Sequence, residues 1–200
     1  NPEKAALYFR EAAELYPQGL NKITQIMVTD LTTHYEGAHR PGHFTGVATI
    51  VLKLFNIVQP DISVFGKKDY QQYCVIKKMV DDLNLNVEII GHETTRETSG
   101  LATSSRNQYL SPAETKTAAL IYQTLQDSAK RIKTGETDYA ALESAAINRL
   151  DQAGFKTDYY SVCSAETLEP ANTKDRQLVI LVTAQLGATR LLDNIEIDLW

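Results

Sequence analysis

Two short polar segments carry residue types that bind phosphate. The first, Gly-Lys-Lys-Asp at residues 66–69, follows an apolar run at 62–65 and precedes a stretch with helical spacing. Between a strand and a helix, a glycine lets the backbone approach a ligand, and the helix N-terminus with two ammonium groups can neutralise a polyphosphate. The pattern is neither a Walker loop nor a dinucleotide fingerprint. A solvated turn, with Asp69 as N-cap and Gln72 completing a capping box, explains the same residues.

The second segment is Thr-Ser-Ser-Arg-Asn at residues 103–107. Consecutive hydroxyls beside a guanidinium form a cluster of donors suited to a triphosphate and to the charge that develops on it. Loops of this kind often become ordered only when a nucleotide binds. An exposed polar loop with no ligand is the alternative interpretation.

Two histidines and two cysteines are weaker candidates for chemistry. His39 and His43 flank a Pro-Gly turn, and no cysteine or carboxylate cluster completes a metal site. We therefore expect a rigid turn that leads into the following helix, and no metal site. Cys74 and Cys163 are too few for a disulfide framework or a zinc quartet, which indicates core thiols in a reducing cytoplasm.

Alternating helices and strands must position the first candidate segment. Apolar residues recur at helical spacing from 47 to 58, before Pro60, and again on a helix that begins near Asp69. Four apolar runs are predicted to be strands: residues 6–9, 25–29, 62–65 and 87–90. Helix, strand, helix, strand with short links is typical of a parallel α/β sheet.

The second half of the chain has a different pattern, and a boundary is expected near residue 94. Residues 92–110 are polar and without period, which predicts a long loop. Ser111 as N-cap with Glu114 positioned for a capping box starts a helix at about 112–133, and a second helix is expected at 138–153. Strands are expected at 159–162, 178–182 and 190–193. These elements predict two units, residues 1–93 and an α+β unit at 94–200.

Composition indicates an ordinary globular chain. Its 200 residues are 43% hydrophobic and 22% charged with a net charge of −5, which excludes intrinsic disorder and argues against nucleic-acid partners. No apolar run approaches the roughly 18 residues of a membrane span, and no signal peptide is evident. The chain does not begin with Met, so we expect it to start partway through a larger protein.

Five segments taken in order are more specific than any one of them. They are HRPGHF at 39–44, KLFNIVQPD at 53–61, FGKKDYQQ at 65–72, SGLATSSRN at 99–107 and GATRLLDN at 187–194. Together they closely resemble the pantothenate synthetase family, and the resemblance covers essentially the whole chain. It implies a Rossmann-like parallel-sheet nucleotidyltransferase core followed by a smaller α+β domain. It also implies ATP-dependent joining of pantoate to β-alanine with Mg²⁺, through a pantoyl adenylate, in a cytoplasmic homodimer.

The resemblance also implies roles for individual residues. Lys68 would contact phosphate and stabilise the charge that grows during adenylation, and Gln72 would hold pantoate. The hydroxyls of the second segment and Arg106 would grip the β- and γ-phosphates, and Thr95 would lie near the adenine side. The full set implied for ATP is Gly66, Lys67, Lys68, Asp69, Thr95, Thr103, Ser104, Ser105 and Arg106. Positioning and charge neutralisation would supply most of the catalysis.

Three departures from the family pattern are evident. Lys67 stands where the family usually has Glu, and Thr103 stands where it has an apolar residue, which changes the charge and polarity of the ATP loops. The family's Met-Gly-x-x-His-x-Gly-His segment, and a glutamine that contacts both acids, have no counterpart. Both would precede Asn1, so we expect the C-terminal portion of the enzyme, with an unpaired sheet edge.

These departures leave two other functions open. A non-catalytic nucleotide-binding or assembly module would bind ATP without turnover. A related adenylating ligase would prefer another acid substrate.

Overall fold

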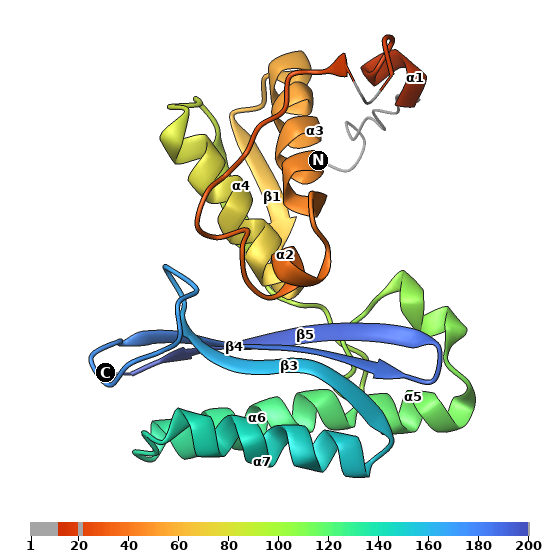
Figure 1. Ribbon diagram of the computed structural model, residues 1–200, viewed down its shortest axis with the longest axis vertical. Coiled ribbons are helices and arrows are strands. Elements are labelled where there is room, and N and C mark those ends of the chain that lie inside the picture. Colours follow the sequence, from red (N-terminus) through yellow and green to blue (C-terminus); the bar gives the residue numbers. More distant parts are fainter. Residues whose placement is uncertain (1–11, 20–21, 200) are drawn as a thin grey trace.

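The computed structural model describes residues 12–19 and 22–199. Two parts lie one above the other in Figure 1, and each has its own sheet. The upper part contains α1 (Ala12–Leu15), α2 (Glu36–His39), α3 (His43–Val58), β1 (Ile62–Gly66), the 3₁₀ turn η3 (Lys67–Asp69), α4 (Tyr70–Asp82) and β2 (Glu88–His92). The lower part contains the 3₁₀ turn η4 (Ser105–Tyr109), α5 (Pro112–Ala118), α6 (Leu120–Lys133), α7 (Tyr139–Gln152), β3 (Phe155–Ser164), β4 (Gln177–Leu186) and β5 (Thr189–Asp198). The strand predicted at residues 6–9 lies outside the described residues.

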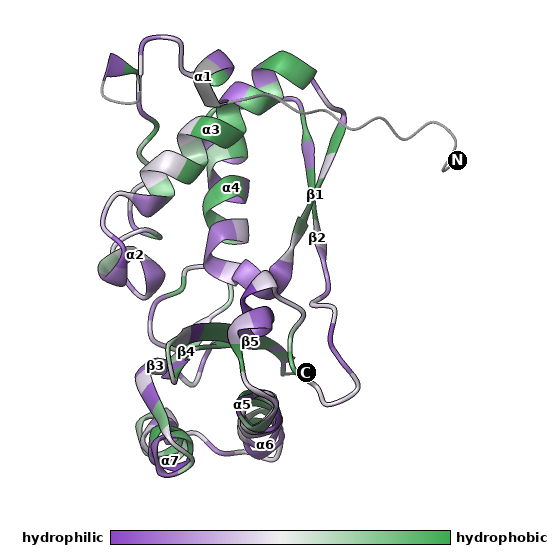
Figure 2. Ribbon diagram, turned by 90° about the vertical axis from the view of Figure 1, so that its right-hand side faces the viewer, coloured by the Kyte–Doolittle hydropathy of each residue, from purple (hydrophilic) through white to green (hydrophobic). Residues whose placement is uncertain are grey.

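The upper sheet is parallel, which confirms the predicted α/β arrangement. β1 and β2 pair in register from Ile62 opposite Glu88 to Gly66 opposite His92. Figure 2 shows α3 and α4 on one side of these strands. On the other side Ile62, Val64 and Ile90 are 52%, 59% and 40% exposed, so an apolar face of the sheet is open among the described residues.

The strand predicted at residues 25–29 is wrong. The backbone there has no regular secondary structure. The Ile26 amide donates to Oγ1 of Thr49 at 3.0 Å, so this segment is bonded to α3 and not to a neighbouring strand. Val28 is buried in the cluster between α3 and α4, which accounts for its apolar character without a sheet.

Backbone geometry defines the start and the end of α3. Gly42, at φ 78°, precedes the helix in the left-handed conformation that glycine adopts without strain. Gln59, at φ 49°, ends it, and its amide donates to the Phe55 carbonyl at 2.8 Å. The rigid turn predicted from the Pro-Gly pair is confirmed.

The start of α4 differs from the capping box considered above. Asp69 is the N-cap residue, but its side chain makes no capping hydrogen bond. The 3₁₀ turn η3 leads directly from β1 into α4, so the chain enters the helix through a tight turn and not through a side-chain cap. Lys67, Lys68 and Asp69 form this turn, at the carboxyl end of β1.

The lower sheet is antiparallel with strand order β3-β4-β5. Each strand has 10 residues, so all three are longer than predicted. Gly187, at φ 56°, lies in the tight turn between β4 and β5. Figure 1 shows α6 and α7 beneath this sheet. The predicted α+β unit is confirmed.

The helix predicted at 112–133 is two helices, because Ala119 is a turn residue between α5 and α6. The capping box of Ser111 and Glu114 is present as predicted. The segment predicted as a long loop is partly ordered. It contains an antiparallel bridge between Arg96 and Ala102 and the 3₁₀ turn η4.

Two hydrophobic clusters lie on the two faces of the lower sheet. Because successive residues of a strand point to opposite faces, β4 contributes to both. Leu178, Ile180 and Val182 join the cluster with α6 and α7. Val179 and Leu181 join the cluster that also contains α3 and α4, so the second cluster spans both parts of the molecule.

Both cysteines lie in the interior, as predicted. Cys74 and Cys163 are buried and unpaired. Burial raises the pKa of each thiol to about 12, so neither is a reactive nucleophile. In the described part of the chain no helix has the length and apolar character to cross a membrane.

Candidate functional site

Lys68 lies where two cavities adjoin, at the junction of the two parts. One cavity is shared with Ser104 and Arg106 of the lower part, and the other with His43 and Gln72 of the upper part. Burial lowers the pKa of Lys68, the charges of Asp69 and Asp193 oppose that effect, and that of Arg106 adds to it. An anion beside Lys68 would favour its charged form.

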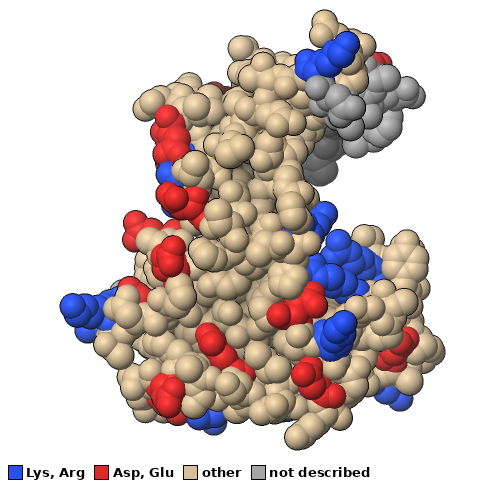
Figure 3. Space-filling model, in the orientation of Figure 1, with Lys and Arg blue, Asp and Glu red and all other residues tan. Residues whose placement is uncertain are grey.

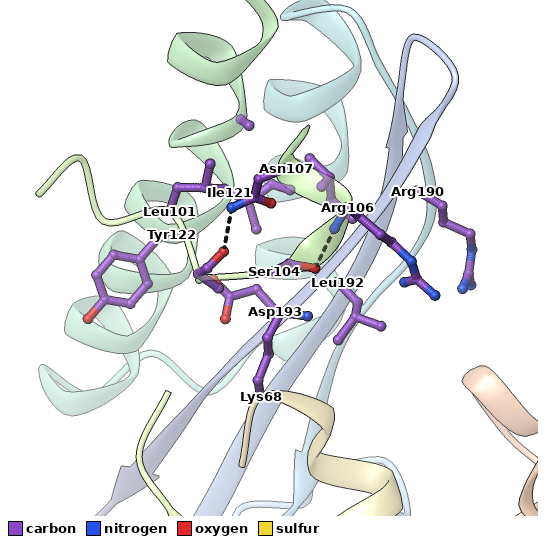
Figure 4. Close-up of a pocket in the computed structure, with 13 residues that line it drawn as sticks. Lys68, Leu101, Ser104, Arg106, Asn107, Ile121, Tyr122, Arg190, Leu192 and Asp193 are labelled. Carbon is purple, nitrogen blue, oxygen red and sulfur yellow. Dashed lines mark hydrogen bonds between the residues drawn. The ribbon is translucent and has the colours of Figure 1, made fainter. Parts of the chain in front are cut away.

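Arg106 comes from η4 and faces the same cavity as Lys68. The side chain of Ser104 caps this turn by accepting a hydrogen bond from the Arg106 amide at 3.2 Å. Figure 4 shows Arg106 and Arg190 with their guanidinium groups on the same side of the cavity. The turn predicted as a polar loop therefore has a defined geometry that presents Arg106.

Lys68 and Arg106 are not neutralised by the part of the chain that the structure describes. The ion pairs found there use other cations, and none includes these two. Figure 3 shows a group of Lys and Arg side chains on the right, where the upper part meets the lower sheet. Lys68 and Arg106 repel each other across one cavity, and although Asp193 also lines it, neither cation forms an ion pair there, which favours a bound anion.

Lys67 points away from this cavity. Its Nζ donates to Glu196 at 2.7 Å and to Glu93 at 3.0 Å. Burial would lower the pKa of Lys67, but the hydrogen bonds from both carboxylates outweigh it and raise the pKa. A Cβ on Gly91 would lie 2.8 Å from Cε of Lys67, so this glycine allows the lysine stem to pass.

The other predicted site residues divide between the two cavities and their surroundings. Asp69 and Gln72 line the second cavity. Thr95 and Thr103 face each other across the bridged loop, where the Thr103 amide donates to the Thr95 carbonyl at 2.8 Å. Neither threonine lines the two cavities, nor does Ser105.

The imidazole ring of His43 lies beside Arg40 at the start of α3. Among residues 12–19 and 22–199, no group of three or more His, Cys, Asp and Glu side chains could hold a metal ion. Nε2 of His43 lies 3.0 Å from NH1 of Arg40, which can only donate, so this ring nitrogen accepts. Burial, together with the charge of Arg40, lowers the pKa of His43 and favours the neutral ring.

A buried ionic network beside the second cavity was missed by sequence reasoning. Glu36 accepts from NH1 and NH2 of Arg190, at 2.7 Å each. It also accepts from the hydroxyls of Tyr159, at 3.0 Å, and Thr183, at 3.1 Å. Burial would raise the pKa of Glu36, but the hydrogen bonds and charge of Arg190 outweigh it and hold the pKa below its usual value. The sequence feature that could have indicated this network is Arg190, a charged residue in the strand predicted at 190–193.

The neighbouring residues of β5 were also missed. Asp193 pairs with Arg96 through two hydrogen bonds of 2.6 and 2.9 Å. Asn194 donates to the backbone carbonyls of Lys67 and Lys68 at 2.9 and 2.8 Å. Strand β5 therefore contacts both segments that the sequence singled out for phosphate binding.

This arrangement can hold a polyanion next to a second polar ligand. The first cavity offers a guanidinium, an ammonium and a serine hydroxyl. The second offers the amide of Gln72 and the other side of Lys68. Because Lys68 lines both cavities, the atoms at which the two ligands meet would lie against Lys68.

Known proteins resemble this chain over most of its length. A model of the family described as pantoate-beta-alanine ligase matches residues 2–196. The chain is 55% identical over 193 residues to a pantothenate synthetase of Shewanella denitrificans, covering 96% of this chain and 68% of that protein. A pantothenate synthetase of Hahella chejuensis is 49% identical over the same length.

Solved structures show the same fold. A pantothenate synthetase from Thermus thermophilus superposes with a TM-score of 0.86 at 40% identity, covering 92% of this chain and 67% of that one. A pantoate-beta-alanine ligase from Francisella tularensis, complexed with beta-gamma ATP and beta-alanine, gives a TM-score of 0.71 at 32% identity and covers 92% of this chain and 61% of that one. The chain thus spans about two thirds of the relatives' length.

Proposed function

This chain belongs to the pantoate-beta-alanine ligase family, and we propose that it joins pantoate to β-alanine by consuming ATP through a pantoyl adenylate. AMP and pyrophosphate are the other products. The observation that carries the proposal is that two cations, Lys68 and Arg106, face one cavity and form no ion pair with the described residues. The relative from Francisella tularensis, which was solved with an ATP derivative and β-alanine, supports the same ligands here.

The proposed ATP site is built from the two loops. The triphosphate lies against the first cavity, held by Lys68, Arg106 and the hydroxyl of Ser104, and Ser105 reaches it from the same turn, outside the cavity. Gly66, Lys67 and Asp69 contribute through the backbone of the turn, since the Lys67 side chain is engaged elsewhere. Thr95 and Thr103 lie on the adjacent bridged loop, where they would border the nucleotide.

Pantoate occupies the second cavity in this proposal. Gln72 holds it, and its carboxylate lies against Lys68. The carboxylate oxygen attacks the α-phosphorus of ATP, and the bond from that phosphorus to pyrophosphate breaks. Lys68 and Arg106 stabilise the negative charge that develops on the phosphate oxygens. The β-alanine amine then attacks the acyl carbon, AMP leaves, and the nitrogen loses a proton.

Magnesium is proposed to arrive bound to ATP. Two of the carboxylates around the cavities, Glu36 and Asp193, are engaged by Arg190 and Arg96. Asp69 also lines the second cavity, but no group of three or more acidic, His or Cys side chains gathers among the described residues, so they do not fit a dedicated magnesium site, whereas phosphate oxygens are ligands that Mg²⁺ prefers. None of the steps above relies on the ion.

The division of the chain at about residue 94 is also a proposal. It is supported by the end of β2 at His92 and by the separate sheet that follows. The homodimer and the cytoplasmic location expected from the resemblance remain predictions.

The test is AMP formation by the complete protein. With ATP, Mg²⁺, pantoate and β-alanine, we expect AMP in amounts that require both acids. Lys68→Met should lower the rate by about 10²–10³-fold, because it removes a charge next to the reacting phosphate. Lys77→Met, at an exposed position on α4 outside both cavities, is the matched control and should leave the rate unchanged.

Two results would overturn the proposal. Binding of ATP without turnover would indicate a nucleotide-binding module. Faster AMP release with a carboxylic acid other than pantoate would indicate a ligase with another substrate.

A further inference from the structure

Strand β5 divides its side chains between the two parts of the molecule. Leu191 and Ile197 belong to the core cluster between the lower sheet and helices α6 and α7. Because side chains alternate along a strand, the even-numbered residues face the upper part. Three of them make polar contacts with it: Arg190 with Glu36, Asn194 with the η3 backbone, and Glu196 with Lys67.

Asn194 holds the turn that carries Lys68. Its amide nitrogen donates both hydrogens, one to the Lys67 carbonyl at 2.9 Å and one to the Lys68 carbonyl at 2.8 Å. Both partners are acceptors, so only one orientation of the amide satisfies them. Asn194 is 5% exposed, which makes the two bonds costly to replace with water.

Asp193, the preceding residue, holds the other loop. Its carboxylate accepts two hydrogen bonds from Arg96 and a third from the backbone N–H of Asn194 at 2.8 Å. The Arg96 guanidinium also donates to the Gly100 carbonyl at 3.1 Å and lies 3.6 Å above the ring of Tyr122. Arg96 is thereby fixed to β5, to α6 and to the turn of the loop that ends at Ser104.

Asp193 and Asn194 are adjacent residues of β5, and each thus holds one of the two segments that carry Lys68 and Arg106. Resting on the function proposed above, we propose that Asp193 and Asn194 are positioning residues that fix the separation of Lys68 and Arg106. Neither is required to touch ATP. They act through the backbone of η3 and through Arg96, and a displacement of about 1 Å at a reacting centre can cost about 10²-fold in rate.

The first measurement is hydrogen exchange in the complete protein without ligands. Asn194→Asp places a carboxylate against two carbonyl oxygens, so we expect faster exchange at residues 66–70. Arg96→Lys retains the charge opposite Asp193 but loses the forked pair and the stacking, so we expect faster exchange at residues 97–106 instead. Asn84→Asp is the matched control, since Asn84 is exposed and Asp also tolerates its left-handed backbone.

The second measurement is steady-state kinetics of AMP formation by the same variants. Asn194→Asp and Arg96→Lys should each lower kcat/KM for ATP by about 10–100-fold, while KM for β-alanine changes less than about twofold. Asn84→Asp should change neither. If these residues had only a structural role, their substitution would lower the folded fraction and leave kcat per folded molecule unchanged.

Each outcome decides the proposal. Exchange at 66–70 that is unchanged in Asn194→Asp would overturn it, as would faster exchange over the whole molecule with normal kinetics. If Asn194→Asp does not fold, Asn194→Ser, which removes the amide without adding charge, takes its place. If the unmodified protein forms no AMP, the proposed function fails, and the exchange data still decide whether Asn194 holds the turn.

Discussion

The Glu36–Arg190 pair should be a principal source of stability between the two parts of the molecule. The perturbation is Glu36→Gln, which keeps the size of the side chain and removes its charge. The Glu36 side chain is 11% exposed and that of Arg190 is 28% exposed, so water can replace little of what is lost. Arg190 retains Asp158, which accepts from its Nε at 2.7 Å, and so is not left without a partner.

The expected magnitude follows from these contacts. Removing one partner of a buried ion pair costs about 3–5 kcal/mol, and the retained Asp158 places Glu36→Gln at the low end, about 3 kcal/mol. For a chain of this length that corresponds to a fall in Tm of about 6–12 °C. Arg190→Met should cost more, because it leaves a buried carboxylate with two hydroxyl donors, those of Tyr159 and Thr183, and a guanidinium of Arg40 that is 4.0 Å away.

Urea unfolding of the complete protein, followed by circular dichroism, measures the loss in the free energy of unfolding. Glu166→Gln, the same change at an exposed residue, is the control and should cost under about 0.5 kcal/mol. The double variant Glu36→Gln/Arg190→Met should cost less than the sum of the single variants, because each removes the same interaction. A cost below about 1 kcal/mol for Glu36→Gln would refute the reasoning.

The same pair predicts how stability depends on pH. The pKa of Glu36 is lower in the folded state than the ordinary 4.5, so its contribution is complete above that value and is lost as pH falls through the folded pKa. The difference in unfolding free energy between the unmodified protein and Glu36→Gln should be constant near neutral pH and shrink in acid. A difference that does not change down to about pH 3 would contradict this.

Three further predictions concern the core, a helix start and the thiols. Leu150→Ala, at a fully buried position beneath the lower sheet, should lower the free energy of unfolding by about 3 kcal/mol. A loss under about 1 kcal/mol in urea unfolding would contradict this prediction. Ser111→Ala removes the capping box of α5 and should cost about 1 kcal/mol in the same assay, with Ser111→Asp restoring most of it. Cys74 and Cys163 should resist a thiol reagent at pH 8 until denaturant is added, since burial raises both pKa values to about 12; fast labelling of the native protein would show that a thiol is accessible.

Elements with strong local signals could be predicted from sequence. α3 and α4 carry apolar residues at helical spacing, and α5 has a capping box, so their existence depends on neighbouring residues alone. The strand expected at 25–29 failed because the apolar character of Val28 serves packing between helices. A run of five residues cannot distinguish these two uses.

The candidate site was only partly accessible to sequence reasoning. The segments that contain Lys68 and Arg106 were singled out by their residue types, but their assignment to one ATP site came from the family resemblance, since nothing in their spacing says that they share a cavity. Glu36 and Arg190 are 154 residues apart, and their contact exists only after both parts have folded. Asp193 and Asn194 were missed as contact residues because a polar residue in a strand usually faces solvent, whereas these two are buried.

The alternation along β5 also limits which changes in chain length the protein can accept. Arg190, Asn194 and Glu196 reach the upper part from one face, and Asp193 reaches Arg96 from the other. Inserting or deleting one residue between Gly187 and Arg190 would rotate the whole strand by one position and exchange its faces. Relatives of this chain should therefore keep the length of the β4–β5 hairpin.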